Sequence, residues 1–187
     1  MPNTLVIIGS GGVGREIAAT LKHIDFADQY VLKGFIDDGQ PTGTLINHLS
    51  VLGNVEWLIH QSQIRQVIIA IGNPQVREKI YTRLKDFYFQ FPTIIHPSAQ
   101  IHDHEFCKIG EGCYIAAQVV MTTNVTIEDF CFINTACTLQ HDTHIEKNCT
   151  VMPGVRITGG ATIGHGSYLS ANLALTTSVI VPSLSKL

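Results

Sequence analysis

The C-terminal half of the chain follows a hydrophobic pattern that repeats every six residues. From Ile109 to Val181, each sixth position carries Ile, Leu, Val or Met. A mostly smaller residue stands two positions before each of them, and every cysteine of the protein falls in this slot. A period of six fits neither the 3.6-residue turn of an α-helix nor simple strand alternation. It predicts a hexapeptide-repeat parallel β-helix, in which each hexad forms a short strand and a corner.

Three hexads make one coil of such a helix, so residues 18 apart should stack at a spacing of about 4.8 Å. Cys113, Cys131 and Cys149 then form one column, with Ser167 next in line. Free cysteine in a buried slot behaves as a small hydrophobe, so we assign these thiols no catalytic or metal-binding role. The cysteines also include no Cys-x-x-Cys pair, and neither a disulfide framework nor a zinc knuckle is indicated.

The repeat is broken once, near its start. Ile101 and Ile109 are eight positions apart instead of six. We therefore expect the first coil to begin at Ile95 and to bulge outward at residues 102–106.

The N-terminal half alternates short apolar runs with helix-like stretches. Runs rich in Ile and Val are typical of strands buried on both faces of a parallel sheet. The predicted strands are Thr4–Ile8, Val31–Ile36 and Gln66–Ile71, and the predicted helices cover about 13–24, 55–60 and 75–88. The predicted fold class is therefore α/β plus β. A small Rossmann-like parallel-sheet domain covers residues 1–92, and the β-helix covers 93–187.

Composition narrows the classes of function. Charged residues are 14% of the 187, and the net charge is −3 without a basic cluster. Nucleic-acid binding is therefore not expected, because it needs a concentrated positive patch. No apolar run approaches the ~18 residues that span a bilayer, so membrane insertion is not expected. Met1-Pro2-Asn3 leads into the first strand without a leader pattern, and the expected compartment is the cytoplasm.

The predicted parallel sheet carries a candidate ligand site at the carboxyl ends of its strands. Gly9-Ser10-Gly11-Gly12-Val13-Gly14 matches G-x-G-x-x-G between a strand and a helix, where glycines let the backbone approach a phosphate. Asp37-Asp38 ends the second strand, and Gly72-Asn73 follows the third. Three such features at one edge favour a nucleotide-containing ligand. The alternative is that the glycines only make a tight turn and the carboxylates only end a strand.

The outward positions of the predicted β-helix are unusually uncharged. Because neutral flat faces suit packing between identical chains, we predict a homo-oligomer, most simply a homotrimer. The positions are Ala116, Ala117, Thr122, Thr123, Thr135 and Ala136.

Among the nine histidines, His141 is the first candidate for chemistry. It lies two positions after the inward Leu139, where a side chain should leave the coil, and Asp142 follows it. An imidazole beside a carboxylate suits general base catalysis, although His144 in the next hexad is an alternative. No metal is expected. The γ-type carbonic anhydrases on similar solenoids bind zinc through histidines five apart, and this chain has no such pair.

Taken in order, the motifs resemble those of a known family. Those motifs are Gly9–Gly14, Gly34-Phe35-Ile36-Asp37-Asp38, Ala70-Ile71-Gly72-Asn73, Ile95-His96-Pro97-Ser98-Ala99 and the hexads with Asn134, His141 and Asp142. The chain resembles the sialic acid O-acetyltransferase family of bacterial sugar acyltransferases. This family includes N-acetyltransferases that act on UDP-4-amino-sugars in bacillosamine and pilin-glycan synthesis.

The resemblance implies a left-handed β-helix, a homotrimer and an acetyl-CoA-dependent acetyltransferase that modifies an amine or hydroxyl of a nucleotide-linked sugar. It implies that His141 is the general base, that Asp142 makes it more basic and that Asn134 supports it. Acetyl-CoA would lie between neighbouring solenoids, near Thr150 and Ala171. The implied contacts of the nucleotide-sugar are Gly11, Gly12, Val13, Asp37, Asp38 and Gly72.

The chain departs from the family pattern at three places. Val13 stands where a histidine is frequent, and Thr150 stands where a histidine is often near acetyl-CoA. The sequence ends at Ser185-Lys186-Leu187 without the Gly-x-Pro-Ala-Lys tail that helps to close the CoA site, so we expect CoA affinity to be affected. Two alternatives stay open: an oligomer that binds a nucleotide-sugar but not CoA, and an NAD-dependent oxidoreductase built on Gly9–Gly14 and Asp37.

Overall fold

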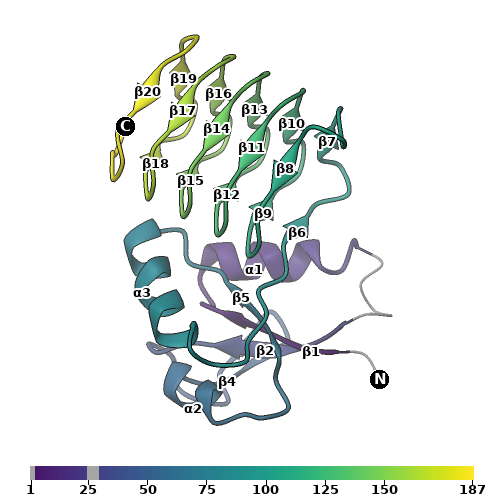
Figure 1. Cartoon of the computed structure of the whole chain (residues 1–187). Helices are drawn as coiled ribbons and strands as arrows, with labels where there is room; N and C mark the ends of the chain where they lie inside the picture. Colours follow the sequence, from purple (N-terminus) through teal and green to yellow (C-terminus); the bar gives the residue numbers. More distant parts are fainter. Residues whose placement is uncertain (1–2, 25–29) are drawn as a thin grey trace. The chain divides into compact units, whose positions relative to one another are not determined.

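The structure is a computed structural model that describes residues 3–24 and 30–187 (Figure 1). The chain divides into two compact units. The first comprises Met1–Gly72 and Val76–Pro92, and the second comprises Asn73–Gln75 and Thr93–Leu187. The short segment Asn73–Gln75 therefore groups with the β-helix, although it lies between two elements of the first unit.

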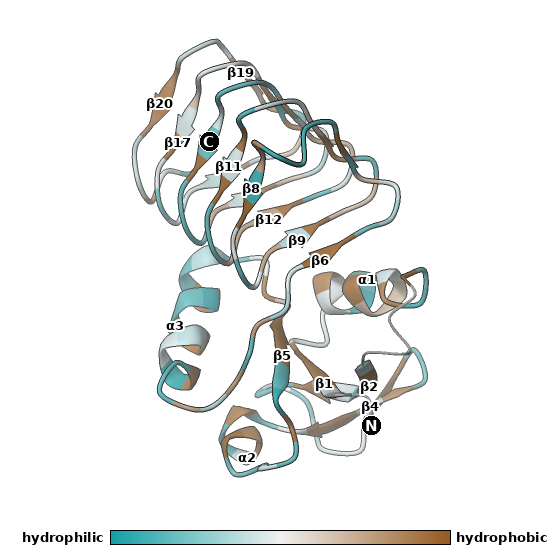
Figure 2. Ribbon diagram, turned by 45° about the vertical axis from the view of Figure 1, so that its right-hand side comes forward, coloured by the Kyte–Doolittle hydropathy of each residue, from teal (hydrophilic) through white to brown (hydrophobic). Residues whose placement is uncertain are grey.

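The first unit contains a five-stranded sheet in the order β3-β4-β2-β1-β5. Its strands are β1 (Asn3–Ile8), β2 (Tyr30–Ile36), β3 (Leu45–Ile46), β4 (Leu49–Gly53) and β5 (Gln66–Ile69). All neighbours pair in parallel except β3 and β4. The interior strand β1 lies between β2 and β5, and its apolar part, Leu5 to Ile8, is at most 2% exposed (Figure 2). The predicted strand type is confirmed, because a strand covered on both faces needs a continuous apolar run.

The three helices of this unit are α1 (Gly12–Thr20), α2 (Val55–Ile59) and α3 (Pro74–Leu84). All three were predicted, but each ends earlier than expected. Beyond Thr20 the backbone tightens, because Lys22 and His23 donate to carbonyls three residues back, which is how helices commonly end. Similarly, β5 stops at Ile69, since the amide of Ile71 turns back to the Ile69 carbonyl.

The antiparallel pair β3–β4 was not predicted. The edge strand β3 has only two residues, and its Leu45 is 71% exposed, so it shows no burial pattern that a sequence could reveal. The two residues between the strands, Asn47 and His48, both have positive φ, 48° and 69°. Such a pair of conformations is typical of a two-residue hairpin turn.

The second unit is a left-handed parallel β-helix of stacked coils, each with three short strands (Figure 1). We name its three sheets by their order along a coil. The first face contains β6 (Ile94–Ile95), β9 (Tyr114–Ile115), β12 (Phe132–Ile133), β15 (Thr150–Val151) and β18 (Tyr168–Leu169). The second face contains β7 (Gln100–Ile101), β10 (Val120–Met121), β13 (Thr138–Leu139), β16 (Arg156–Ile157) and β19 (Ala174–Leu175). The third face contains β8 (Lys108–Ile109), β11 (Thr126–Ile127), β14 (His144–Ile145), β17 (Thr162–Ile163) and β20 (Ile180–Val181).

Three corners join these faces. We call the turn between the first and second faces the first corner, the turn between the second and third faces the second corner, and the turn into the next coil the third corner. Phe132 pairs with Tyr114 on one side and Thr150 on the other, which confirms the stacking of residues 18 apart. In the first coil the offset is larger, because Val120 pairs with Gln100. The extra residues lie at the second corner, as the interrupted repeat predicts.

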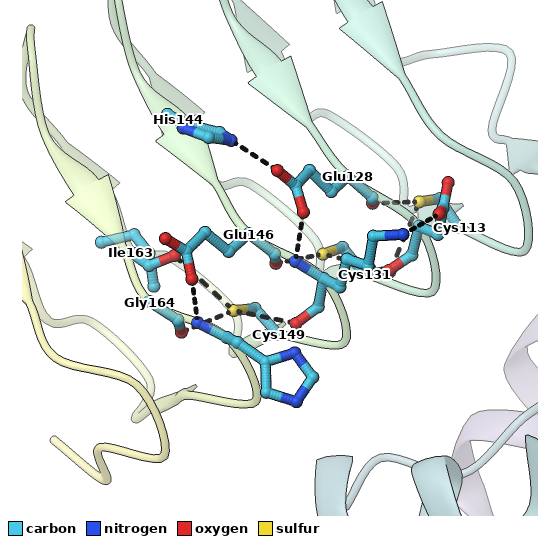
Figure 3. A network of polar contacts seen from close by, with 11 residues as sticks. Cys113, Glu128, Cys131, His144, Glu146, Cys149, Ile163 and Gly164 are labelled. Atoms are coloured by element: carbon cyan, nitrogen blue, oxygen red, sulfur yellow. Dashed lines mark hydrogen bonds and ion pairs between the residues drawn. The ribbon is translucent and has the colours of Figure 1, made fainter. Parts of the chain in front are cut away.

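The cysteine column is part of the core. Cys113, Cys131 and Cys149 are at most 1% exposed, and each thiol lies 3.0–3.2 Å from a carbonyl oxygen fifteen residues ahead (Figure 3). Ser167 continues the column and donates its hydroxyl to the Pro182 carbonyl at 3.0 Å. This column therefore holds small side chains that each donate one hydrogen bond, a weak one from a thiol or a stronger one from a hydroxyl.

The outer surface of the β-helix agrees only partly with expectation. Ala117, Thr122, Thr123 and Thr135 are partly exposed and Ala136 is exposed. Ala116 is fully buried, so its assignment as an outward surface residue is wrong. It follows Ile115 directly and starts the turn of the first corner, where the chain folds its side chain against the molecule. Among the described residues, no helix is long and apolar enough to cross a membrane.

Candidate functional site

His141 and Asp142 form a hydrogen-bonded pair at the second corner. The corner follows β13, and its turn closes where the buried Thr143 donates its hydroxyl to the Gln140 carbonyl at 2.7 Å. The Nδ1 atom of His141 lies 2.8 Å from Oδ2 of Asp142. Both side chains are more than half exposed, so the imidazole lies on the surface and a substrate can reach it.

The carboxylate of Asp142 is held from two sides. His141 binds one oxygen, and Nδ2 of Asn124 donates to the other at 3.1 Å. These hydrogen bonds lower the pKa of the Asp142 carboxyl below its ordinary value, because both favour the charged form. An ionised carboxylate only accepts hydrogen bonds, so the proton in the pair lies on Nδ1 of His141. The other ring nitrogen, Nε2, is then the basic atom.

The imidazole of His141 lies over a glycine of the next coil. A methyl group placed on Gly159 would meet Cε1, Nε2 and Nδ1 of the ring at 2.4, 2.6 and 2.9 Å. Heavy atoms do not approach so closely, so the ring occupies the space that a side chain at position 159 would need. Neither Asn124 nor Gly159 was singled out from the sequence, although the 18-residue period places Asn124 beside Asp142 and Gly159 beside His141. The period could therefore have found both positions, but not the contacts that their side chains make or leave room for.

His144, the alternative histidine, has a different setting. It projects from β14 on the third face, and its Nε2 lies 2.9 Å from Oε1 of Glu128 (Figure 3). The other oxygen of Glu128 accepts the backbone N–H of Lys147 at 3.1 Å, and the Lys147 ammonium pairs with Asp129 at 3.0 Å. His144 thus belongs to a polar network that links successive coils at the third corner. These contacts give His144 a structural role.

The remaining predicted residues of the β-helix lie away from His141 within this chain. Asn134 is at the first corner, only 8% exposed, and its Nδ2 donates to the Val151 carbonyl at 2.9 Å. Ala171 is exposed at the same corner two coils later. Thr150 lies in β15 and is 1% exposed, so its side chain offers no surface to acetyl-CoA in this arrangement. The structure therefore does not bring Asn134, Thr150 and Ala171 together with His141 and Asp142 in one chain.

In the first unit, the glycine loop is tied to Asp37. The N–H and hydroxyl of Ser10 both donate to Oδ2 of Asp37, at 2.8 and 2.5 Å, and the N–H of Gly39 donates to Oδ1 at 2.9 Å. Partial burial raises the pKa of the Asp37 carboxyl, but these hydrogen bonds outweigh it and leave the pKa below its ordinary value. The carboxylate thus stays charged and fixes the loop that follows β1.

Asp38 is held in a comparable way. It accepts the Val55 N–H at 2.8 Å and the guanidinium of Arg83 at 2.8 Å. Burial raises the pKa of Asp38, whereas these partners lower it by more. Asp37, Asp38 and Arg83 line a hollow of about 310 Å³, together with Ile8, Gly9, Ile36, Gly39, Val55, Ile71, Val76, Lys79 and Ile80.

The hollow confirms that β1, β2 and β5 bring their ends to one edge. Gly11 and Gly12 follow the lining residue Gly9 but do not themselves line the hollow. They lie in open space, since a methyl group on either would meet no atom within 4 Å. Val13 is close to Gly72, whose added methyl would lie 3.4 Å from the valine side chain. Arg83 and Lys79 come from α3, a helix that carried no motif. Their charge could be noticed in the sequence, but only the fold shows that they face the hollow. Among the described residues, no three His, Cys, Asp or Glu side chains are grouped to hold a metal ion.

Comparisons with known proteins bear on both units. Residues 4–84 match the family model of the PglD N-terminal domain, and residues 142–176 match that of the bacterial transferase hexapeptide (six repeats). The chain is also similar to the acetyltransferase domain of PglB from Neisseria gonorrhoeae FA1090, solved in complex with acetyl coenzyme A. They share 25% identity over 98% of this chain and 86% of that one, with a TM-score of 0.84. The resemblance to the bacterial sugar acyltransferases is confirmed.

Two further solved structures share this fold. WeeI from Acinetobacter baumannii AYE is 25% identical over 98% of this chain and 95% of its own, with a TM-score of 0.73. PerB from Caulobacter crescentus, in complex with CoA and GDP-perosamine, is 20% identical over 98% and 93%, with a TM-score of 0.71, and at that identity it supports the fold alone. None of the curated proteins matches the chain. No comparison supports the oxidoreductase or the CoA-free alternative.

Proposed function

We propose that this protein transfers the acetyl group of acetyl-CoA to an amine or hydroxyl of a nucleotide-linked sugar, as a step in bacterial glycan synthesis. The observation that carries the proposal is the His141–Asp142 pair, exposed on a hexapeptide-repeat β-helix. The similar acetyltransferase domain of PglB, which binds acetyl coenzyme A, supports the choice of donor. Because acetyl-CoA is a cytoplasmic metabolite, the proposal places the reaction in the cytoplasm.

The first unit supplies the site for the nucleotide-sugar. The open backbone at Gly11 and Gly12 leaves room for a phosphate beside the start of α1, where free N–H groups favour negative charge. Lys79 and Arg83 add positive charge to the hollow. Asp37 and Asp38 already accept hydrogen bonds from the protein, so in this state they mainly shape the site for the ligand.

The donor site requires a second copy of the chain. The first corner, with Asn134 and Ala171, and the second corner, with His141, belong to different edges of the β-helix. In a homotrimer the first corner of one chain can face the second corner of its neighbour, and the active site then lies between chains. Small side chains on the first corner fit this role, because Ala171 and Ala136 are exposed and leave room for the thin pantetheine arm of acetyl-CoA.

The proposed chemistry is direct transfer. Acetyl-CoA supplies the acetyl group as a reactive thioester. The amine or hydroxyl of the sugar attacks the thioester carbonyl, so that a C–N or C–O bond forms and the C–S bond breaks. The Nε2 atom of His141 takes the proton from the attacking group, while Asp142 holds Nδ1 and stabilises the protonated ring. The ring then returns this proton to the sulfur of the departing CoA. A covalent acyl-enzyme is not needed. The Cys137 thiol is a poor nucleophile in any case, since burial raises its pKa to about 11.

The test replaces His141 and His144 separately. His141→Ala should lower the turnover number by about 100-fold or more, the usual contribution of a general base, while oligomeric state is kept. His144→Ala is the matched control and should retain most activity. Release of thiol from acetyl-CoA would be followed against a panel of UDP-amino-sugars and CMP-sialic acid. Full activity in His141→Ala, or its loss only in His144→Ala, would contradict the assignment.

A further inference from the structure

The backbone of the second corner is fixed on both sides of His141. The N–H of Asp142 donates to the Thr123 carbonyl of the preceding coil at 3.2 Å, and the His141 carbonyl accepts the N–H of Gly160 from the next coil at 2.9 Å. These bonds fix the Cα positions but leave the imidazole free to rotate about its side-chain bonds. Its orientation must therefore come from side-chain contacts.

Resting on the proposed function, we propose that Asn124 and Gly159 are positioning residues that set the orientation and tautomer of His141. Asn124 orients the carboxylate of Asp142 from the preceding coil, and Gly159 leaves the space into which the ring is directed from the next coil. Together they hold Nδ1 on the carboxylate and leave Nε2 as the atom that accepts the proton.

The asparagine is not needed for the backbone conformation alone. Asn124 has φ of +54°, a conformation that favours asparagine and glycine. Equivalent corner positions with φ near +60° nevertheless carry Gln118, Ala136 and Ser178. The slot therefore accepts several residue types. What distinguishes Asn124 is its amide, which donates to the only oxygen of Asp142 that His141 leaves open.

The glycine is likewise not explained by the turn. The equivalent positions are His141 one coil before, Thr177 one coil after and Thr123 two coils before, and Gly159 is not among the glycines with positive φ. An alanine would therefore fit the backbone there. The three nearest atoms that its methyl would meet all belong to the His141 imidazole. The absence of a side chain at Gly159 thus leaves free the space that the His141 ring occupies.

The first experiment is a thermodynamic cycle on thermal unfolding. Gly159→Ala should lower the melting temperature by about 2–4 °C or more in the wild-type background, because the methyl and the imidazole compete for one space. In the His141→Ala background the same change should cost little, because the ring is gone. An equal loss in both backgrounds would overturn the role of Gly159. Thr177→Ala, at the equivalent position two coils beyond His141, is the control for the slot itself.

The second experiment tests Asn124 with Asn124→Gly, which keeps the positive-φ backbone and removes only the amide. Nitrogen-15 NMR of the His141 ring, above pH 8, should show Nδ1 protonated in the wild type and a mixture of tautomers in the variant. The turnover number should fall about threefold to tenfold, the value of one such hydrogen bond, with the KM values for both substrates unchanged. Ser178→Gly at the same corner should change neither the tautomer ratio of His141 nor the turnover number. An unchanged tautomer ratio, or a change in KM alone, would overturn the role of Asn124.

These outcomes separate this inference from the proposed function. The melting temperatures and the ring nitrogen signals report on the orientation of His141 whether or not the protein is an acetyltransferase. If they change as expected while the wild-type protein transfers no acetyl group to any acceptor of the panel, the proposed function fails and the positioning stands. If His141→Ala abolishes transfer but neither readout responds, the positioning fails alone.

Discussion

At the scale of single residues, the cysteines show how a repeat can remove reactivity. Cys113, Cys131, Cys137 and Cys149 are buried in the inward slot of the β-helix. Burial, together with the neighbouring thiols of the column, raises the pKa of Cys131 well above its ordinary value. A thiol reacts as its thiolate, so these side chains act as core residues. Cys107 alone is partly exposed.

This difference predicts the thiol reactivity of the native protein. At pH 8, Ellman's reagent should modify Cys107 quickly and the four buried cysteines only when the protein unfolds. Because burial keeps the reagent away from these four thiols, increasing the pH to 9 should accelerate their reaction little. The colour yield before addition of guanidinium measures the exposed thiol, and the further yield after its addition measures the four buried thiols. Cys107→Ser should remove the fast phase, and rapid reaction of a second thiol in that variant would contradict the prediction.

At the scale of elements, the glycine loop between β1 and α1 contains two kinds of glycine. A methyl group on Gly14 would lie 1.9 Å from the Gly9 carbonyl oxygen, so this glycine is required for the helix to pack on the loop. Gly11 and Gly12 have open space where a side chain would stand. Their lack of a side chain is not explained by packing, which is consistent with close approach of a ligand to the backbone.

The two kinds of glycine should respond differently to alanine. Gly14→Ala should lower the free energy of unfolding by several kcal/mol, as expected when a methyl group is forced into a packed site. Gly11→Ala and Gly12→Ala should change stability little but weaken nucleotide-sugar binding about tenfold or more, an effect of about 1.4 kcal/mol. Denaturant unfolding and titration calorimetry provide the two measurements. Unchanged binding in both Gly11→Ala and Gly12→Ala would contradict a phosphate contact at this loop.

At the scale of the whole molecule, the proposed active site is shared between chains. His141 and Asn134 project from different corners of one β-helix, so a site that uses both must combine two copies. An isolated chain would carry each half without its complement. This is why the proposal joins activity to a homotrimer.

Mixing two inactive variants tests the shared site directly. His141→Ala and Asn134→Ala chains, each inactive alone, should recover activity when they are unfolded and refolded together. Random assembly of equal amounts restores about a quarter of the sites, because each needs one intact His141 and one intact Asn134 from neighbours. Native mass spectrometry would verify three chains per particle and their mixing. Mixed trimers without activity would show that both residues act within one chain, and an Asn134→Ala protein that is active by itself would show that Asn134 has no role.

The sequence predicted most of the fold, and some features escaped it for physical reasons. The hexad pattern predicted the coils and the insertion after Ile101, because each large residue must face the same narrow core. The hairpin β3–β4 was missed, since two-residue edge strands bury too little to leave a pattern. The ends of α1 and α3 were placed too late, because local turn hydrogen bonds there compete with the helix.

The candidate site, like the fold, was predicted in part from the sequence and in part needed the structure. The sequence by itself determined the period of the solenoid, the glycine loop with Asp37-Asp38, and the adjacent His141-Asp142, because these features are local or strictly periodic. The 18-residue period also places Asn124 beside Asp142 and Gly159 beside His141. Only the tertiary structure decided that the Asn124 amide donates to the carboxylate, that the imidazole lies over Gly159, and that Thr150 is buried. Such contacts depend on the direction of each side chain. At a corner this direction is set by packing between coils rather than by the repeat.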